Sequence, residues 1–447
     1  MFEHTALWKC VQTAGAQASP SKETLEALAD PQLCLALCNS VVGILPFEQA
    51  LIAIRKCCLL DWTLADIPLV LLAAFAYQGF RNEYVWEIGP DEQAACDALA
   101  AKAKAGTLGI SELFLLAAYR PLHRIEGIET CEPLLEKDDS GFARDIWRQQ
   151  VEEPQEEEQI KPEIPVLTSI EDTVSQNVQA QYEVNPYPRW STLDTVEPLE
   201  FKTHFERAFP HYPYITAIPS SCDVLVAGSG SGKQPLTLAN TFKRFHVTGV
   251  DLSKTSLAYA IRKQKEVAPG VTVKFAQADI LKLEEAFEPE SFDMVQCTGV
   301  LHHMDDPMAG WKVLHRLLKP KGLMKIGLYS EIARRGVTVL REKIAKEGLP
   351  YTDEGIRRLR EHIKAHPDEP DYKWVLQTID FYSTSACRDL LFHVQEHQFT
   401  IPKIEAAIAE LGLEFIGWDH PSPHVPKAFN EKFPEHEPPG SFEQWDT

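Results

Sequence analysis

The feature that most constrains the fold is a glycine-rich turn, Gly228-Ser229-Gly230-Ser231-Gly232, between a short apolar run and a helical stretch. Glycines at such a place let the backbone turn tightly and approach a ligand closely, beside the positive end of a helix dipole. A tight turn without a ligand would explain the same residues. Lys233 stands where the dinucleotide fingerprint GxGxxG would place its third glycine, so the sequence disfavours that interpretation.

Apolar runs and helical stretches alternate along the chain around this turn. The runs with strand character cover residues 222–230, 245–251, 271–279, 291–299 and 323–330. Such alternation predicts right-handed strand–helix–strand units and a mostly parallel, twisted sheet. The runs show little polar alternation, which fits burial on both faces. We therefore predict an α/β, Rossmann-like core with helices on both faces of the sheet.

Helical segments are expected to precede and follow this core. Residues 1–150 carry apolar residues at three- and four-residue steps, which predicts an all-helical N-terminal domain. The acidic, proline-interrupted stretch Val151–Pro165 is interpreted as a solvated linker. The predicted divisions are 1–150, the helical domain; 151–200, the linker and a lid or strap; 201–330, the core; 331–420, a helical substrate cap and the last helix and strand (413–419) of the core; and 421–447, a Pro-rich tail.

The net charge of −21 restricts the partners. Binding to nucleic acid or to an anionic membrane surface normally needs the opposite balance, although a local basic groove is not excluded. The longest apolar run, Ile67–Tyr77, contains Pro68 and is shorter than the ~20 residues that span a bilayer. The chain starts without a secretory signal pattern, and its ten cysteines form no CxxC pair. We expect a cytoplasmic protein with reduced thiols and without a membrane or nucleic-acid partner.

Two acidic residues end the second and third strand-like runs. Asp251 lies 19 residues after Gly232, where a carboxylate can accept hydrogen bonds from both hydroxyls of a ribose. Its alternative role is to cap the next helix, together with Ser253. Asp279 lies where it could accept a hydrogen bond from an adenine amine. A glycine loop followed by these two acids indicates a nucleoside-bearing ligand more specifically than any one of them.

The segments VLVAGSGSGKQ, VTGVDLS, FAQADIL, FDMVQCTGVLHHMDDP and LLKPKGLMKIGLYS together resemble the class I S-adenosylmethionine-dependent methyltransferases over about residues 220–330. The resemblance implies S-adenosylmethionine as the cofactor and S-adenosylhomocysteine as the product. It implies that the glycine loop lines the methionine and ribose side, that the two acids hold ribose and adenine, and that the residues after the fourth strand face the sulfonium. The implied cofactor residues are Gly228, Ser229, Gly230, Gly232, Gln234, Asp251, Leu252, Asp279, Ile280, Gly299 and Val300.

Val226 departs from this family pattern, because many members carry Asp or Glu two residues before the first glycine. That acid organises the loop and binds the methionine amine, which here would fall to Gln234 or to water. The flanking residues 181–190 and 381–419 resemble a subgroup often fused to tetratricopeptide repeats. No convincing repeat of about 34 residues is found in the helical segment.

Candidate acceptor residues lie on both flanks of the core and after its fourth strand. In YEVNPYPRW, Tyr182, Asn185, Tyr187 and Arg189 could form a stiff lid over the cofactor, and the alternative is a strap that packs Trp190 on the core. His302 and His303 follow the fourth strand, where one could act as a general base, or both could be structural. The catalytic candidates are His302, His303 and Tyr187; Tyr329 is a candidate substrate residue.

HVQEH, His393–His397, has the HxxEH spacing of inverted zinc peptidases. Histidines four apart on a helix share a face and could bind zinc, with Glu396 as the base. Only 50 residues follow, and a third ligand would be needed, so no metal is predicted. We favour a helix that roofs the acceptor pocket, with Arg388, His393 and His397 as polar contacts; plain surface histidines are the alternative.

The resulting hypothesis is a methyltransferase that acts on an N or O atom of a small molecule or of a peptide or protein. Two alternatives remain: an interaction scaffold that binds the cofactor without turnover, which Val226 would permit, and a nicotinamide-dependent oxidoreductase. Binding of the cofactor without turnover would favour the scaffold. Binding of NADH would favour the oxidoreductase, against which the glycine spacing argues.

Overall fold

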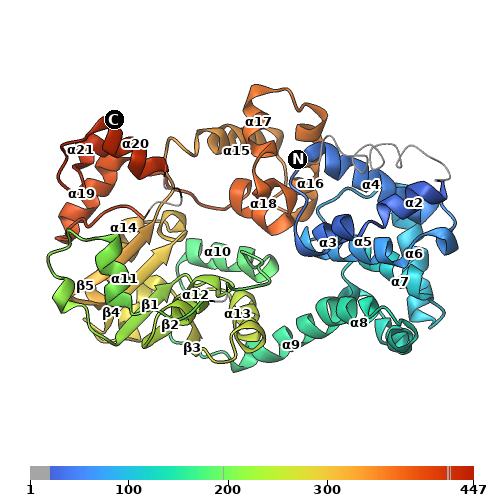
Figure 1. Cartoon of the computed structure of the whole chain (residues 1–447), viewed down its shortest axis with the longest axis horizontal. Coiled ribbons are helices and arrows are strands. Elements are labelled where there is room, and N and C mark those ends of the chain that lie inside the picture. Colours follow the sequence, from blue (N-terminus) through green and yellow to red (C-terminus); the bar gives the residue numbers. More distant parts are fainter. Residues whose placement is uncertain (1–20, 195, 420–421, 423) are drawn as a thin grey trace. The chain divides into compact units, whose positions relative to one another are not determined.

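The computed structural model describes residues 21–194, 196–419, 422 and 424–447. The chain divides into two compact units (Figure 1). The helical unit consists of Met1–Glu158 and Gly336–Phe392, and the α/β unit consists of Gln159–Arg335 and His393–Thr447. Each unit therefore contains two separate stretches of the chain.

The first stretch of the helical unit is built from helices, as predicted for residues 1–150; positions 1–20 lie outside the described residues. Its core centres on α5 and α7, whose apolar residues are almost all buried. The helices are α2 (Lys22–Leu28), α3 (Pro31–Asn39), α4 (Leu45–Leu60), α5 (Leu69–Arg81), α6 (Pro90–Lys104), α7 (Ile110–Tyr119) and α8 (Phe142–Trp147), with short 3₁₀ segments between them.

The stretch predicted as a solvated linker is mostly helical. A π-helical turn, η5 (Arg148–Glu152), leads into α9 (Glu153–Ile160) and the 3₁₀ turn η6 (Lys161–Glu163). Pro154 lies inside a continuous helix, directly after the π-helical turn, and such a turn is where a helix accommodates a residue without an N–H. Val151 and Ile160 are buried, so the few apolar residues in this acidic stretch anchor it.

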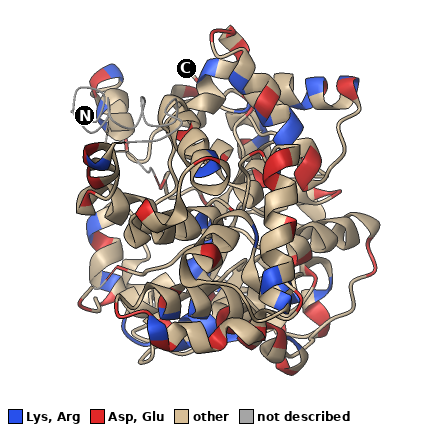
Figure 2. Ribbon diagram, turned by 90° about the vertical axis from the view of Figure 1, so that its right-hand side faces the viewer, with Lys and Arg blue, Asp and Glu red and all other residues tan. Residues whose placement is uncertain are grey.

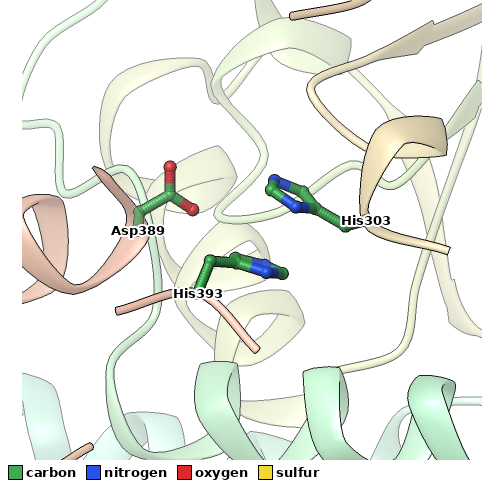
Figure 3. Close-up of side chains that lie close together, drawn as sticks. All are labelled: His303, Asp389 and His393. Atoms are coloured by element: carbon green, nitrogen blue, oxygen red, sulfur yellow. The ribbon is translucent and has the colours of Figure 1, made fainter. Parts of the chain in front are cut away.

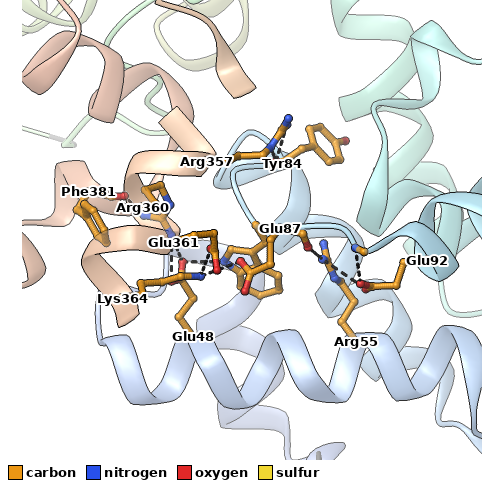
Figure 4. Close-up of polar contacts among 12 residues, drawn as sticks. Glu48, Arg55, Tyr84, Glu87, Glu92, Arg357, Arg360, Glu361, Lys364 and Phe381 are labelled. Carbon is orange, nitrogen blue, oxygen red and sulfur yellow. Dashed lines mark hydrogen bonds and ion pairs between the residues drawn. The ribbon is translucent and has the colours of Figure 1, made fainter. Parts of the chain in front are cut away.

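The second stretch of the helical unit was predicted to cap the core, and the structure instead places it with the N-terminal helices. Its elements are α15 (Arg335–Glu347), α16 (Asp353–Ala365), α17 (Pro370–Leu376), η10 (Ile379–Tyr382) and α18 (Thr384–Leu391). A buried ion pair attaches α16 to α4: Arg360 Nη2 donates to both carboxylate oxygens of Glu48, at 2.7 and 2.9 Å (Figure 4). The side chains are 1% and 0% exposed.

Further polar contacts surround this ion pair. The indole of Trp86 donates to Glu48 Oε1 at 2.9 Å. Lys364 of α16 pairs with Glu87 at 2.7 Å, and Arg357 donates to the carbonyl of Tyr84 at 3.0 Å (Figure 4). A buried charge without its partner is strongly destabilising, so these contacts explain why residues 336–392 belong to the helical unit.

The α/β unit contains a five-stranded, entirely parallel sheet among the described residues. Its strands are β1 (Cys222–Ala227), β2 (Phe245–Asp251), β3 (Val273–Gln277), β4 (Phe292–Thr298) and β5 (Leu318–Gly327), in the order β3-β2-β1-β4-β5. The connecting elements are α12 (Lys233–Thr241), α13 (Lys254–Val267), η8 (Ile280–Glu285), η9 (Leu301–His303) and α14 (Pro307–Leu317). The predicted Rossmann-like α/β core is confirmed.

Both faces of the sheet are buried, as the apolar strands predicted. Val224 and Val226 of β1 belong to one apolar cluster, and Leu225 and Ala227 belong to another. Alternate residues of a strand point to opposite faces, so each face carries its own core. The order of the strands reverses between β1 and β4, and ligands of open parallel sheets bind outside the carboxyl ends of the strands at such a point.

The C-terminal segment differs from its prediction. Residues 413–419, expected as a strand, have no regular secondary structure. The segments after α19 (Ile401–Leu411) and before the core are helical: α10 (Thr173–Val184), α11 (Phe201–Ala208), α20 (His424–Lys432) and α21 (Phe442–Trp445). The Pro-rich tail is ordered by aromatic packing, with Phe429 stacked on Trp445 at 3.7 Å and Phe415 against Phe442 at 4.6 Å.

Charged residues are distributed over the described helices and loops. Figure 2 shows Lys and Arg interspersed with Asp and Glu. Among the described residues, no helix is both long enough and apolar enough to cross a membrane.

Candidate functional site

The glycine loop joins β1 to α12 at the point where the strand order reverses. Its glycines have positive φ angles: 74° at Gly228, 52° at Gly230 and 85° at Gly232. A Cβ atom on Gly228 would collide with the side chain of Val300, and one on Gly232 with Ala260. The loop therefore lies directly against the residues after β4 and against α13. Any residue with a side chain at Gly228 or Gly232 would prevent this close approach.

Asp251 ends β2 and is tied to the glycine loop. Its Oδ2 atom accepts from the Gly230 N–H at 2.8 Å, and its Oδ1 atom accepts from the Ser253 N–H at 2.9 Å. Burial raises the pKa of Asp251 to about 6, although these N–H groups oppose the shift. Ser253 caps α13 with its own hydroxyl, so the cap and the predicted ligand acid are separate residues. The half-buried Leu252 lies between them.

Asp279 follows β3 and is 2% exposed. Its Oδ1 atom accepts from the Leu281 N–H at 3.0 Å. Burial raises the pKa of Asp279, and the Leu281 N–H and the nearby Ser175 hydroxyl oppose this. Ile280, the next residue, is buried as the first residue of η8. The two acids thus lie at the carboxyl ends of the neighbouring strands β2 and β3.

Val226, which departs from the family pattern, is a buried apolar side chain. The position two residues before Gly228 therefore carries no acid. Gln234, in the first turn of α12, donates from Nε2 to Gln296 Oε1 at 2.7 Å and lies 3.4 Å from Thr298 Oγ1. Gln296 and Thr298 belong to β4, and Gly299 follows with a φ of 79°. Neutral amide and hydroxyl groups therefore stand beside the glycine loop at the end of β4.

Residues 185–190 pack on the glycine loop as a strap. Ser231 Oγ donates to the carbonyl of Pro188, and the indole of Trp190 donates to the carbonyl of Ser231 at 3.0 Å. A Cβ atom on Gly230 would lie 2.9 Å from the carbonyl of Tyr187. These contacts support the strap interpretation for Trp190. Tyr187 and Asn185 are half-buried and Arg189 is exposed, and their role as a lid stays a prediction.

Several predicted acceptor-side residues form a row of stacked planar groups. His393 lies 5.9 Å from the ring of Tyr182 and stacks on His303 at 3.4 Å (Figure 3). His302 lies 4.3 Å from His303 and stacks on Tyr329 at 3.8 Å, and the guanidinium of Arg334 covers Tyr329 at 4.0 Å. The row collects side chains from α10, from the turn after β4, from the segment after β5 and from residues after α18.

His302 and His303 differ in their surroundings. His302 is fully buried, and both its ring nitrogens have no hydrogen-bond partner among the described residues. Burial lowers the pKa of His302 to about 2, with smaller contributions from His303 and Arg334. Such an imidazole is a poor proton acceptor, so the structure argues against His302 as the general base. His303 Nδ1 lies 2.7 Å from the carbonyl of Gln395 and donates to it, so Nε2 is the basic nitrogen of the neutral ring.

The HVQEH segment is not helical, which contradicts the predicted roof helix. Helix α18 ends at Leu391, and His393–His397 run in extended and bent conformation. Arg334 binds the carboxylate of Glu396 through two nitrogens, so Glu396 is engaged by a cation. The His397 N–H donates to the carbonyl of His302 at 2.7 Å, which ties the segment to the turn after β4. His393 and His397 therefore do not share the face of a helix, which the zinc interpretation requires.

Arg388, predicted as a contact of the acceptor, lies on α18 of the helical unit. There it pairs with Asp353 at 2.7 Å and donates to the carbonyl of Tyr351. The sequence prediction failed here because one helix was assumed to continue from Arg388 through His397.

Four residues beside the predicted site were missed from the sequence: Thr168, Ser175, Glu183 and Gln296. Thr168 Oγ1 accepts from the Asp279 N–H at 2.8 Å, and Glu183 accepts from the Lys254 N–H at 2.7 Å. Thr168 and Ser175 precede the core in a stretch that carries no motif of its own, whereas Glu183 lies within YEVNPYPRW, where only its neighbours were considered. Gln296 could have been found as a polar residue inside an apolar strand.

The central part of the α/β unit matches a known protein family. Residues 225–326 match the family model described as "Methyltransferase domain". These residues form a methyltransferase domain. The domain contains the glycine loop, both acids and the histidines after β4.

The similar proteins are related over parts of the chain. An uncharacterized protein of Synechococcus is 25% identical over 263 residues, which cover 56% of this chain and 62% of the relative. A ubiquinone biosynthesis O-methyltransferase of Pseudomonas syringae is 37% identical over 99 residues, covering 22% of this chain and 40% of the relative. PKMT2 from Rickettsia typhi, solved in complex with AdoHcy, shows 20% identity and a TM-score of 0.42 over 55% of this chain and 50% of that protein. The chain thus spans less than two thirds of each relative's length.

Proposed function

We propose that the chain transfers a methyl group from S-adenosylmethionine to an N or O atom of an acceptor, which is a small molecule or a peptide or protein. The observation that carries the proposal is the convergence of a glycine loop, Asp251 and Asp279 at the carboxyl edge of the sheet, within the methyltransferase domain. The cofactor-binding scaffold and the oxidoreductase gain no specific support from the geometry.

The residues at this edge fit the cofactor. Asp251 is a buried carboxylate with a raised pKa, and a pair of ribose hydroxyls would supply the donors that stabilise its charge. The glycine loop offers backbone close to Val300, where the sulfonium end would lie. Gln234, beside Gln296 and Thr298, would hold the methionine amine in place of the acid missing at Val226.

When bound, the cofactor would supply an activated methyl group, which would bond to the acceptor in line with the breaking carbon–sulfur bond, with S-adenosylhomocysteine as the leaving group. Positive charge disperses in the transition state, so the chain's main work is to align the acceptor and exclude water. The row of rings from Tyr182 to Tyr329 would form the wall against which the acceptor lies. His303, with Nε2 as its basic nitrogen, would take the proton from an acceptor that arrives protonated. Tyr187, Asn185 and Arg189 would close over the site as a lid, and His393 and His397 would complete the acceptor wall.

The test is transfer of radiolabelled methyl groups into a cell lysate that is afterwards separated into macromolecules and small molecules. Label in one fraction identifies the acceptor class. Asp251→Ala should abolish the label. Asp223→Ala, a change in an exposed aspartate at the other end of the same sheet, should preserve it. Calorimetry of folded protein that shows no heat with S-adenosylhomocysteine would refute the proposal.

A further inference from the structure

The stretch of residues 165–190 precedes the methyltransferase domain, which begins at residue 225, yet it contacts Asp279, the glycine loop and the first turn of the helix after Asp251. At its start it extends the sheet. Val166 pairs in parallel with Gln277, the last residue of β3; the Leu167 N–H donates to the Gln277 carbonyl at 2.9 Å, and the Gln277 N–H donates to the Pro165 carbonyl at 2.8 Å. This pairing fixes the stretch two residues before Asp279.

The first cofactor element that it contacts is Asp279. Thr168, itself buried, accepts from the Asp279 N–H at 2.8 Å. Ser175, buried in the first turn of α10, donates its N–H to Asp172 at 2.8 Å, and its hydroxyl lies close enough to the Asp279 carboxyl to lower the pKa of that acid. Residues outside the domain therefore hold the backbone of the acid and approach its carboxyl group.

The other two elements are contacted further along. Glu183 accepts from the N–H groups of Lys254 and Thr255 at 2.7 and 3.2 Å, in the first turn of α13, directly after the Asp251 and Ser253 pair. Trp190 and the carbonyl of Pro188 bind Ser231 in the glycine loop. A stretch that only covered the sheet would not need a polar contact to every one of these elements.

We propose that residues 165–190 form part of the nucleoside site, with Ser175 and Thr168 as positioning residues that orient Asp279 toward the exocyclic amine of adenine. The proposal rests on the proposed function. A carboxylate accepts up to about four hydrogen bonds; the Leu281 N–H occupies one of these positions, and the nearby Ser175 hydroxyl is placed to occupy a second. These two donors restrict where the remaining lone pairs point, and an amine of adenine is a donor suited to them.

The chemistry predicts discrimination between purines. Hypoxanthine carries a carbonyl oxygen where adenine carries the amine, so its lone pairs would face those of Asp279. A site that leaves a buried charged group without its donor binds such an analogue poorly. If Ser175 orients Asp279, removing its hydroxyl should weaken binding of the adenine ligand and leave the hypoxanthine ligand nearly unaffected.

The experiment is calorimetric titration of the full chain with S-adenosylhomocysteine and with S-inosylhomocysteine. The wild-type protein should bind the adenosyl ligand at least roughly tenfold more tightly. Ser175→Ala should reduce this preference roughly fivefold to tenfold through the adenosyl ligand alone. Thr173→Ala, a change in an exposed residue of the same helix, should leave the preference unchanged.

Thr168 provides an independent pair of variants. Thr168→Val removes the acceptor of the Asp279 N–H and should reduce the preference, and Thr168→Ser restores the hydroxyl and should restore it. If Ser175→Ala and Thr168→Val weaken both ligands equally, or neither, the two residues do not position Asp279 and the inference is overturned. A folded wild-type protein that binds neither ligand would instead overturn the proposed function.

Discussion

The two units bury charged side chains in different ways. In the helical unit, Glu48 is neutralised by the guanidinium of Arg360 and also binds the indole of Trp86. In the α/β unit, Asp251 and Asp279 accept from backbone N–H groups, and no ion pair to either is found among the described residues. Charges that are paired internally hold helices together, whereas carboxylates with neutral partners retain capacity for a ligand.

The largest effect on this comparison is expected from Arg360→Met. It leaves Glu48 charged and buried without its partner, so the free energy of unfolding in urea should fall by about 3–5 kcal/mol. Lys104→Met, which removes the exposed pair with Glu126, should lower it by less than about 1 kcal/mol. The double variant Glu48→Leu with Arg360→Met should recover much of the loss; a double variant as unstable as the single one would contradict the ion-pair explanation.

Asp251→Asn tests the other side of the comparison. It should weaken binding of S-adenosylhomocysteine roughly hundredfold, because two charge-assisted hydrogen bonds to ribose become neutral ones. Urea denaturation should show only a modest loss of stability, because removal of a charge that is unfavourable in the folded protein partly offsets the backbone N–H that the amide nitrogen cannot accept. A large loss of stability would mean that Asp251 is structural, as Glu48 is.

His303 and His302 are adjacent histidines with different expected roles. His303→Gln should lower methyl transfer into lysate at least about tenfold, with binding of S-adenosylhomocysteine retained. His302→Phe keeps a planar ring against Tyr329 and should change transfer less than about twofold. Equal losses of methyl transfer in the two variants would contradict the assignment of the proton acceptor to His303 and not to His302.

The pH dependence of S-adenosylhomocysteine binding should be the smallest of these effects. The pKa of Asp251 in the folded protein, about 6, lies above its value in an unfolded chain, so protonation favours the folded state as the pH falls from about 7 to 4. Ribose binding needs the ionised form, so affinity for S-adenosylhomocysteine should fall up to about tenfold between pH 6 and 5. Calorimetry at several pH values measures this, and Asp251→Asn should flatten the profile.

The sequence predicted the α/β core well because its signals are local. Apolar strands, the glycine turn and the acids after β2 and β3 are each defined by a few consecutive residues, and the methyltransferase domain at 225–326 confirms the assignment. The association with tetratricopeptide repeats and the roles of individual site residues stay predictions.

The errors arose where distant residues decide the outcome. Nothing near Arg360 indicates that it pairs with Glu48, 312 positions earlier, so α16 was assigned to the wrong part of the molecule. The helix from Arg388 to His397 was predicted from spacing alone. The structure ends α18 at Leu391, and the chain continues in a non-helical segment in which Phe399 pairs with Ser330. Ser175 and Thr168 were missed because their importance comes from a single distant carboxylate.

The division of the helical unit into two stretches has a consequence for how the protein is made. During synthesis, residues up to Glu158 leave the ribosome long before Arg360 exists, and the whole domain at 225–326 is translated in between. Glu48 therefore has no Arg360 to pair with until α16 has been synthesised. A gene truncated after residue 330 would therefore encode the domain at 225–326, but neither the second stretch of the helical unit nor residues 393–447 of the α/β unit.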